Sequence, residues 1–130
     1  MKHEPITPID RRALDAALRL FVAAFVVDDK RTQIHNRLLA ADRRGETLAS
    51  LPRWLAVPAT PLAGVDRSPD GLRNRFGELT GIYLGDGPSH RTTIARALEL
   101  GRAKPSLFIA DTGHVAMITV ADGELLCSRF

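Results

Sequence analysis

Hydrophobic residues recur with the period of a helix in the first part of the chain. Leu14, Leu18, Phe21 and Phe25 follow one another at intervals of four, three and four residues, which places them on one helical face. This spacing predicts a long helix over about 8–27. Its second half is hydrophobic on more than one side. A second copy of the chain could therefore cover part of this helix, and a homodimer is one expectation.

Two further helical segments are predicted before the middle of the chain. The second helix spans about 29–44 and is expected to end at Gly45. Arg43 and Arg44 are interpreted as basic side chains that match the negative end of this helix. A shorter helical piece follows over 46–55.

The pattern then loses its periodicity. Three prolines and a glycine predict an irregular connection over about 56–69. A short helix is expected after this connection, as far as Leu79.

The last third of the chain changes to strand-forming patterns. Residues 81–84 predict a short strand, and 89–101 predict a helix. Three hydrophobic runs follow, separated by aspartate and glycine turns of the kind that tight hairpins need. They predict a three-stranded antiparallel meander over about 106–130. The chain is thus predicted to be one α+β domain, 1–130, whose N-terminal helices pack on one face of a small, mainly antiparallel C-terminal sheet.

Composition narrows the class of protein but not its activity. The 130 residues are 45% hydrophobic and 25% charged, which is ordinary for one globular domain. The net charge is +3 with both signs interleaved, and aromatic residues make up 5%, so a nucleic-acid partner is not expected. The longest hydrophobic run, 20–27, is far shorter than the roughly 18 residues that span a bilayer, so no membrane partner is expected. A lone cysteine, Cys127, favours a cytoplasmic location.

One stretch could bind an anion. It combines the strand at 81–84, a glycine-bearing turn and a helix predicted to start at Ser89, whose free N–H groups would point at a phosphate or carboxylate. The spacing matches neither a phosphate-binding P-loop nor a complete dinucleotide-binding fingerprint, because His90 stands where the third glycine belongs. A plain turn with Ser89 as the helix cap is the alternative interpretation. The candidate anion-binding residues are Gly85, Gly87, Ser89, Arg91, Thr92 and Thr93.

Catalytic chemistry finds less support. The segments 81–87 and 113–118 each resemble a strand of the NlpC/P60 cysteine peptidases, but they lie in the reverse order. That family also implies a cysteine upstream of the histidine, whereas Cys127 follows His114. The four histidines are scattered and no metal-ligand spacing occurs. No catalytic residue, cofactor or metal is therefore predicted.

Three functional hypotheses follow. The first is a small, non-catalytic cytoplasmic domain that binds another protein, as an adaptor, an immunity-type inhibitor or a regulator. The second, from a different class, is a sensor or enzyme that binds a phosphorylated or carboxylated small molecule at 85–93. The third is a nucleic-acid accessory protein.

Overall fold

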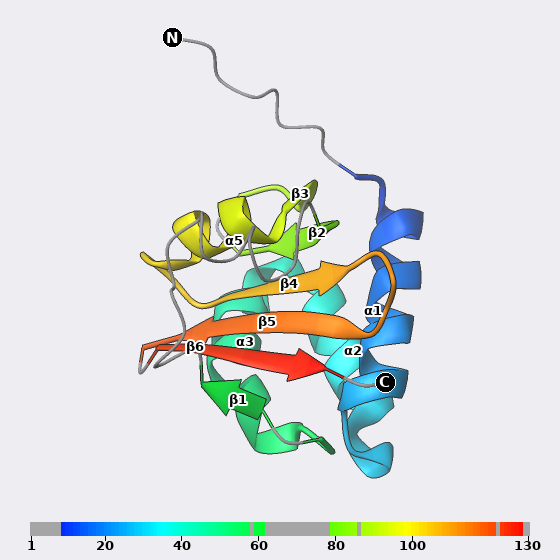
Figure 1. Ribbon diagram of the computed structural model, residues 1–130. Coiled ribbons are helices and arrows are strands. Elements are labelled where there is room, and N and C mark those ends of the chain that lie inside the picture. Colours follow the sequence, from blue (N-terminus) through cyan, green and yellow to red (C-terminus); the bar gives the residue numbers. More distant parts are fainter. Residues whose placement is uncertain (1–8, 58, 62–78, 86, 122, 129–130) are drawn as a thin grey trace, which may run out of the picture.

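The described elements form three layers, with an antiparallel sheet between several helices on one face and a single helix on the other (Figure 1). The computed structural model describes residues 9–57, 59–61, 79–85, 87–121 and 123–128. The helical elements are α1 (Arg11–Phe25), η1 (Asp28–Lys30), α2 (Arg31–Leu39), η2 (Ala41–Arg43), α3 (Arg44–Ser50), η3 (Leu51–Trp54) and α5 (Ile94–Gly101). The strands are β1 (Ala59–Pro61), β2 (Thr80–Leu84), β3 (His90–Thr93), β4 (Ser106–Ala110), β5 (Val115–Val120) and β6 (Gly123–Ser128). The α+β class is confirmed.

The long first helix is confirmed, with a later start than predicted. Asp10 is its N-cap and accepts a hydrogen bond from the backbone N–H of Ala13 at 2.7 Å. The helix ends at Phe25 because Val26 is extended and forms an isolated antiparallel bridge with Leu55. Its buried residues include the whole predicted face. The start of the predicted range, at 8, lies outside the described residues.

The predicted second helix, 29–44, is wrong at its C-terminal end. The α-helix stops at Leu39 because Ala40 adopts an extended conformation, and the short 3-10 turn η2 follows. Gly45 does not end a helix but lies within α3. Arg44 therefore stands at the start of a helix rather than at the end of one, and its interpretation as a complement to a negative helix end is also wrong.

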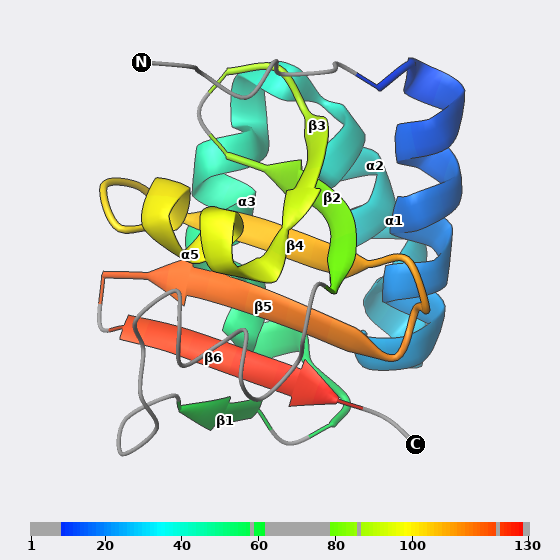
Figure 2. The same ribbon diagram turned by 45° about the horizontal axis from the view of Figure 1, so that its top comes forward.

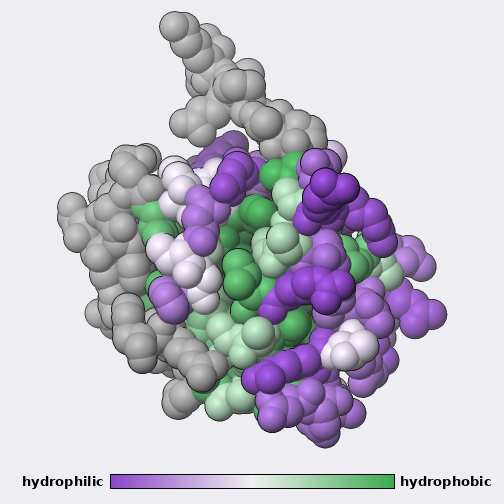
Figure 3. All heavy atoms as spheres, turned by 90° about the vertical axis from the view of Figure 1, so that its right-hand side faces the viewer, coloured by the Kyte–Doolittle hydropathy of each residue, from purple (hydrophilic) through white to green (hydrophobic). Residues whose placement is uncertain are grey.

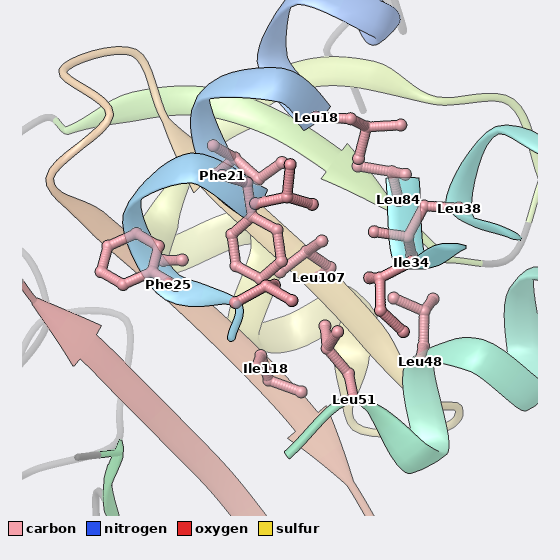
Figure 4. Packing of buried hydrophobic residues seen from close by; sticks show 14 of the residues in the cluster. Leu18, Phe21, Phe25, Ile34, Leu38, Leu48, Leu51, Leu84, Leu107 and Ile118 are labelled. Atoms are coloured by element: carbon pink, nitrogen blue, oxygen red, sulfur yellow. The ribbon is translucent and has the colours of Figure 1, made fainter. Parts of the chain in front are cut away.

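The main hydrophobic core lies between these helices and one face of the sheet. Figure 4 shows Phe21 of α1 and Ile34 of α2 pointing toward the strand residues Leu107 and Ile118. All four side chains are almost completely buried. Burial of a side chain of this size stabilises the fold by about 1.5–3 kcal/mol. The core holds α1, α2 and α3 against the sheet.

The sheet has the strand order β1-β6-β5-β4-β2-β3, and every neighbouring pair is antiparallel. The predicted meander is confirmed as β4, β5 and β6. Gly113 and Gly123 take positive φ values of 75° and 133° in its turns. The predicted connection 56–69 is not irregular throughout, because 59–61 form β1 against β6. The helix expected after this connection, as far as Leu79, lies outside the described residues except for Leu79 itself.

The segment between β2 and β4 differs most from expectation. β2 and β3 pair as a hairpin. The predicted helix start at Ser89 is wrong, because α5 begins at Ile94 with Thr93 as its N-cap. This helix also covers the face of the sheet opposite to α1–α3 (Figure 2). Its Leu98 packs there in a second core with Phe108. The N-terminal helices thus lie on one face, as predicted, and α5 covers the other.

The outer surface of α1 is partly hydrophobic. Figure 3 shows this side of the molecule, where hydrophobic surface runs between hydrophilic side chains. Leu20 is 55% exposed and is the one large hydrophobic residue exposed in the described part of the chain. The rest of the hydrophobic face of α1 is buried within the chain, and the homodimer stays a prediction. Among the described residues, no helix is both long and apolar enough to cross a membrane.

Candidate functional site

The turn between β2 and β3 is held to the helical layer by one arginine. The guanidinium of Arg44, at the start of α3, donates to Ser89 Oγ at 2.9 Å and approaches the carbonyl oxygen of Gly87 at 3.4 Å. Ser89 is 8% exposed. Its carbonyl oxygen accepts a further hydrogen bond, at 3.2 Å, from the N–H of Ile9. Ser89 thus joins the start of α1, the start of α3 and the hairpin.

Arg91, the predicted anion ligand, forms an ion pair instead. Its guanidinium lies 2.6 Å from Asp111 Oδ1, and Thr80 Oγ1 donates to the other carboxylate oxygen at 2.7 Å. The side chains of Arg91 and Asp111 remain 52% and 40% exposed. An exposed pair of this kind contributes about 0–1 kcal/mol to stability.

The other predicted ligands serve the local structure. Thr92 pairs with Gly81 in the ladder, and Thr93 Oγ1 accepts from the N–H of Arg96 at 3.2 Å to cap α5. Gly87 takes φ 82° in the turn. Gly85 packs so close to the ring of Tyr83 that a side chain at this position would overlap it. The structure therefore brings Gly87 and Ser89 together but not Arg91 and Thr93, and anion binding stays a prediction.

Sequence reasoning missed Arg44. Its partner Ser89 lies 45 positions further along the chain, and no local pattern connects the two residues. The only local signal in the sequence was Gly45, which disfavours a continuous helix through Arg44.

The backbone of β3 bonds to β2 at every second residue. The N–H of Ile94, one residue beyond the strand, donates to the carbonyl oxygen of Leu79 at 3.0 Å. Bonded pairs alternate in an antiparallel ladder, so His90 and Thr92 direct their N–H and C=O groups toward β2. Arg91 lies between them and directs its backbone groups away from the sheet.

This outer side of β3 is an edge of the sheet. In the described part of the chain, the one backbone hydrogen bond that reaches it is from Ile9 to Ser89. Within the same part of the chain, no backbone partner meets the outward N–H and C=O of Arg91. The opposite edge of the sheet, β1, has three residues and ends at Pro61, which has no N–H to donate.

Cys127 lacks the environment of a nucleophile. It lies on β6 between Ala116 of β5 and Ala59 of β1, and its side chain is fully buried. Burial raises the pKa of the thiol from 9.0 to about 11. His114 is exposed in the turn before β5. The thiol is therefore protonated at neutral pH and closed off from solvent.

A second buried titratable group lies between α1 and α2. His35 Nε2 lies 2.8 Å from Asp15 Oδ1, but the contact does not have the geometry of a hydrogen bond. The other oxygen of Asp15 accepts from Arg19 at 2.8 Å. The hydrogen bond from Arg19 is the main cause that lowers the pKa of Asp15. Among the described residues, no group of three histidine, cysteine or acidic side chains is placed to hold a metal ion.

Comparison with known proteins adds no relative to this geometry: no family model, curated protein or solved structure matches the chain.

Proposed function

We propose that the chain is a non-catalytic protein-binding domain, of an adaptor or regulatory type, that takes an extended segment of another protein along the outer edge of β3. The observation that carries this proposal is the outward backbone of Arg91 on an edge strand, which meets no backbone partner among the described residues. An added strand satisfies such groups with main-chain hydrogen bonds, and its side chains supply specificity. The free, buried Cys127 fits a reducing compartment, and we place the domain in the cytoplasm.

The β3 edge is open to a partner segment and is supported from behind by β2. β3 is four residues long and carries Arg91, and short length and charge are the features by which edge strands avoid pairing with copies of themselves. The strand behind it, β2, pairs with β4 in the body of the sheet. Tyr83 and Phe108, on these two strands, are buried in the second core. A partner segment would thus meet a short but rigid template.

The small-molecule hypothesis finds less support in the same contacts. Arg44 donates to two oxygens of the turn and Arg91 to a carboxylate, so both guanidiniums already have acceptors. The first turn of α5 starts at Ile94, so it lies at the opposite end of β3 from Gly87.

Backbone amide signals provide the test. We would titrate the ¹⁵N-labelled protein with an acetylated hexapeptide alternating threonine and valine, and with a copy N-methylated at every second amide. We expect the amide of Arg91 to shift with the first peptide and not with the second, because N-methylation removes the donors that strand addition needs. No response at Arg91, or an equal response to both peptides, would overturn the proposal.

Two proline substitutions distinguish the loss of an N–H at the sheet edge from the loss of an N–H within the hairpin. Arg91→Pro removes an outward N–H, whereas Thr92→Pro removes an N–H that bonds to β2. Proline has no amide signal of its own, so binding to Arg91→Pro is read from the neighbouring amides of His90 and Thr92. We expect this variant to keep the folded spectrum and to lose the shifts that the peptide causes at these two amides in the unsubstituted protein. Thr92→Pro, the matched control, is expected to lower the thermal midpoint because it breaks the hairpin ladder. Arg91→Ala retains the edge N–H and should retain binding.

A further inference from the structure

The outer edge of β3 presents its backbone groups at every second residue. His90 and Thr92 bond to β2, so the outward positions are Ser89, Arg91 and Thr93. An added antiparallel strand would bond to these positions one after another, because each of them directs both an N–H and a C=O to the same side. The length of segment that the edge accepts therefore depends on which of these groups already have partners.

Both ends of this edge meet other parts of the chain. Thr93 is the N-cap of α5, and the carbonyl oxygen of an N-cap accepts the first hydrogen bond of its helix. At the other end, the carbonyl oxygen of Ser89 accepts the N–H of Ile9 at 3.2 Å. Arg91 lies between them, and neither of its outward groups meets a backbone partner in the described part of the chain. The edge thus presents one complete bonding position, closed on one side by a helix and on the other by Ile9.

The two closures are held differently. The helix α5 is fixed by its buried residues in the second core, including Leu98. Ile9 makes one main-chain hydrogen bond to the edge, and its side chain is only partly buried against the main core. The next residue, Asp10, caps α1 through its own hydrogen bond from the N–H of Ala13 at 2.7 Å, so the cap of α1 does not depend on the contact of Ile9 with the edge. Ile9 is therefore the closure that a partner segment can displace.

We propose that Ile9 is an autoinhibitory contact, which occupies the Ser89 end of the β3 edge and restricts strand addition to Arg91. The proposal rests on the proposed function, because it describes the regulation of the same edge. While Ile9 is bound, a short segment binds as well as a long one, since residues that extend past Arg91 must first displace Ile9. Once Ile9 is released, the ladder continues to Ser89 and a longer segment binds more tightly. One net hydrogen bond corresponds to about a three- to tenfold change in affinity.

Two peptides of different length test the proposal. One is a hexapeptide and the other a tetrapeptide, both alternating threonine with valine and both acetylated and amidated. We would measure the affinity of each from the shift of the Arg91 amide, in the unsubstituted protein and in two variants of Ile9. Ile9→Pro removes the N–H that binds to Ser89. Ile9→Ala is the matched control, because it keeps this N–H and shortens the side chain.

We expect the affinities of the two peptides to agree within about twofold in the unsubstituted protein and in Ile9→Ala. In Ile9→Pro, the hexapeptide should bind about three- to tenfold more tightly than the tetrapeptide, and the amide of Ser89 should respond to it. A preference of this size for the hexapeptide in the unsubstituted protein, a comparison that needs no variant, would overturn the proposal. No gain in Ile9→Pro, or an equal gain in Ile9→Ala, would also overturn it and leave strand addition at Arg91 standing. If neither peptide shifts Arg91 in any of the three proteins, the proposed function itself fails.

Discussion

The guanidinium of Arg44 donates a hydrogen bond to the hydroxyl of Ser89 across 2.9 Å and joins the first turn of α3 to the β2–β3 turn. This contact connects the helical layer with the edge of the sheet at the point where the backbone of Ile9 also binds. The position of the β3 edge therefore depends on a side chain that lies on a different layer of the fold.

Removal of this hydrogen bond should loosen the turn. We expect Arg44→Ala to lower the free energy of unfolding by about 1 kcal/mol, which corresponds to a thermal midpoint lower by roughly 3–5 °C in a chain of this size. The neighbouring Arg43→Ala is the control, because Arg43 is exposed and should change stability by less than about 0.5 kcal/mol. A double-mutant cycle with Ser89→Ala should give a coupling of about 0.5–1.5 kcal/mol, and a coupling near zero would contradict this role.

Two glycines should respond in opposite ways to alanine. A methyl group at Gly81 would overlap the carbonyl oxygen of Ile109 in the neighbouring strand β4. We expect Gly81→Ala to cost about 3 kcal/mol or more, because backbone has to move to relieve the overlap. Gly45 has no atom within 4 Å of its added methyl group and lies within α3, so Gly45→Ala should stabilise by about 0.5–1 kcal/mol. Urea unfolding of both variants measures the contrast.

The thiol of Cys127 should react only after unfolding. Because burial raises its pKa to about 11, we expect its modification by a disulfide reagent at pH 8 to be at least about 100-fold slower in the folded than in the denatured protein. A cysteine introduced at the exposed position Ala103, in a Cys127→Ala background, should react rapidly in the folded state. Fast reaction of native Cys127 would show that the β1 edge opens readily.

The same pKa predicts a loss of stability in alkaline solution. The folded state favours the neutral thiol, so this contribution is fully present below pH 9.0 and declines as the pH rises toward about 11. The complete difference is worth about 2–3 kcal/mol once the pH exceeds both values. Cys127→Ala should flatten this part of the curve of unfolding free energy against pH, and an identical slope in both proteins would argue against a buried thiol.

Acid should lower the stability of the fold through protonation of Asp15. The hydrogen bond from Arg19 lowers the pKa of this carboxyl below its ordinary value of 3.8. Its contribution to stability is therefore present above that value and is lost as the pH falls through the lower folded-state pKa. We expect Asp15→Asn to reduce the fall in urea midpoint between pH 5 and pH 2.5. Asp29→Asn, at an exposed position without an ion pair in the described chain, should leave that fall unchanged.

The candidate site was only partly accessible to sequence reasoning. Its position near 85–93 was predicted, because glycine, serine and arginine after a short strand indicate a turn with donors. Its organisation was not, since Arg91 turns to Asp111, 20 positions away, and the cation at Ser89 comes from Arg44. The open backbone of Arg91 is a property of strand order, which no single segment encodes.

The sequence by itself determined what depends on neighbours along the chain. The spacing of Leu14, Leu18 and Phe21 specifies α1, and the glycines of the β4–β5 and β5–β6 turns specify the meander, because helical periodicity and positive φ are local requirements. Tertiary structure decided the rest. The break at Ala40, the pairing of β3 with β2 and the placement of α5 on the opposite face follow from packing between distant segments, which overrides local helix preference.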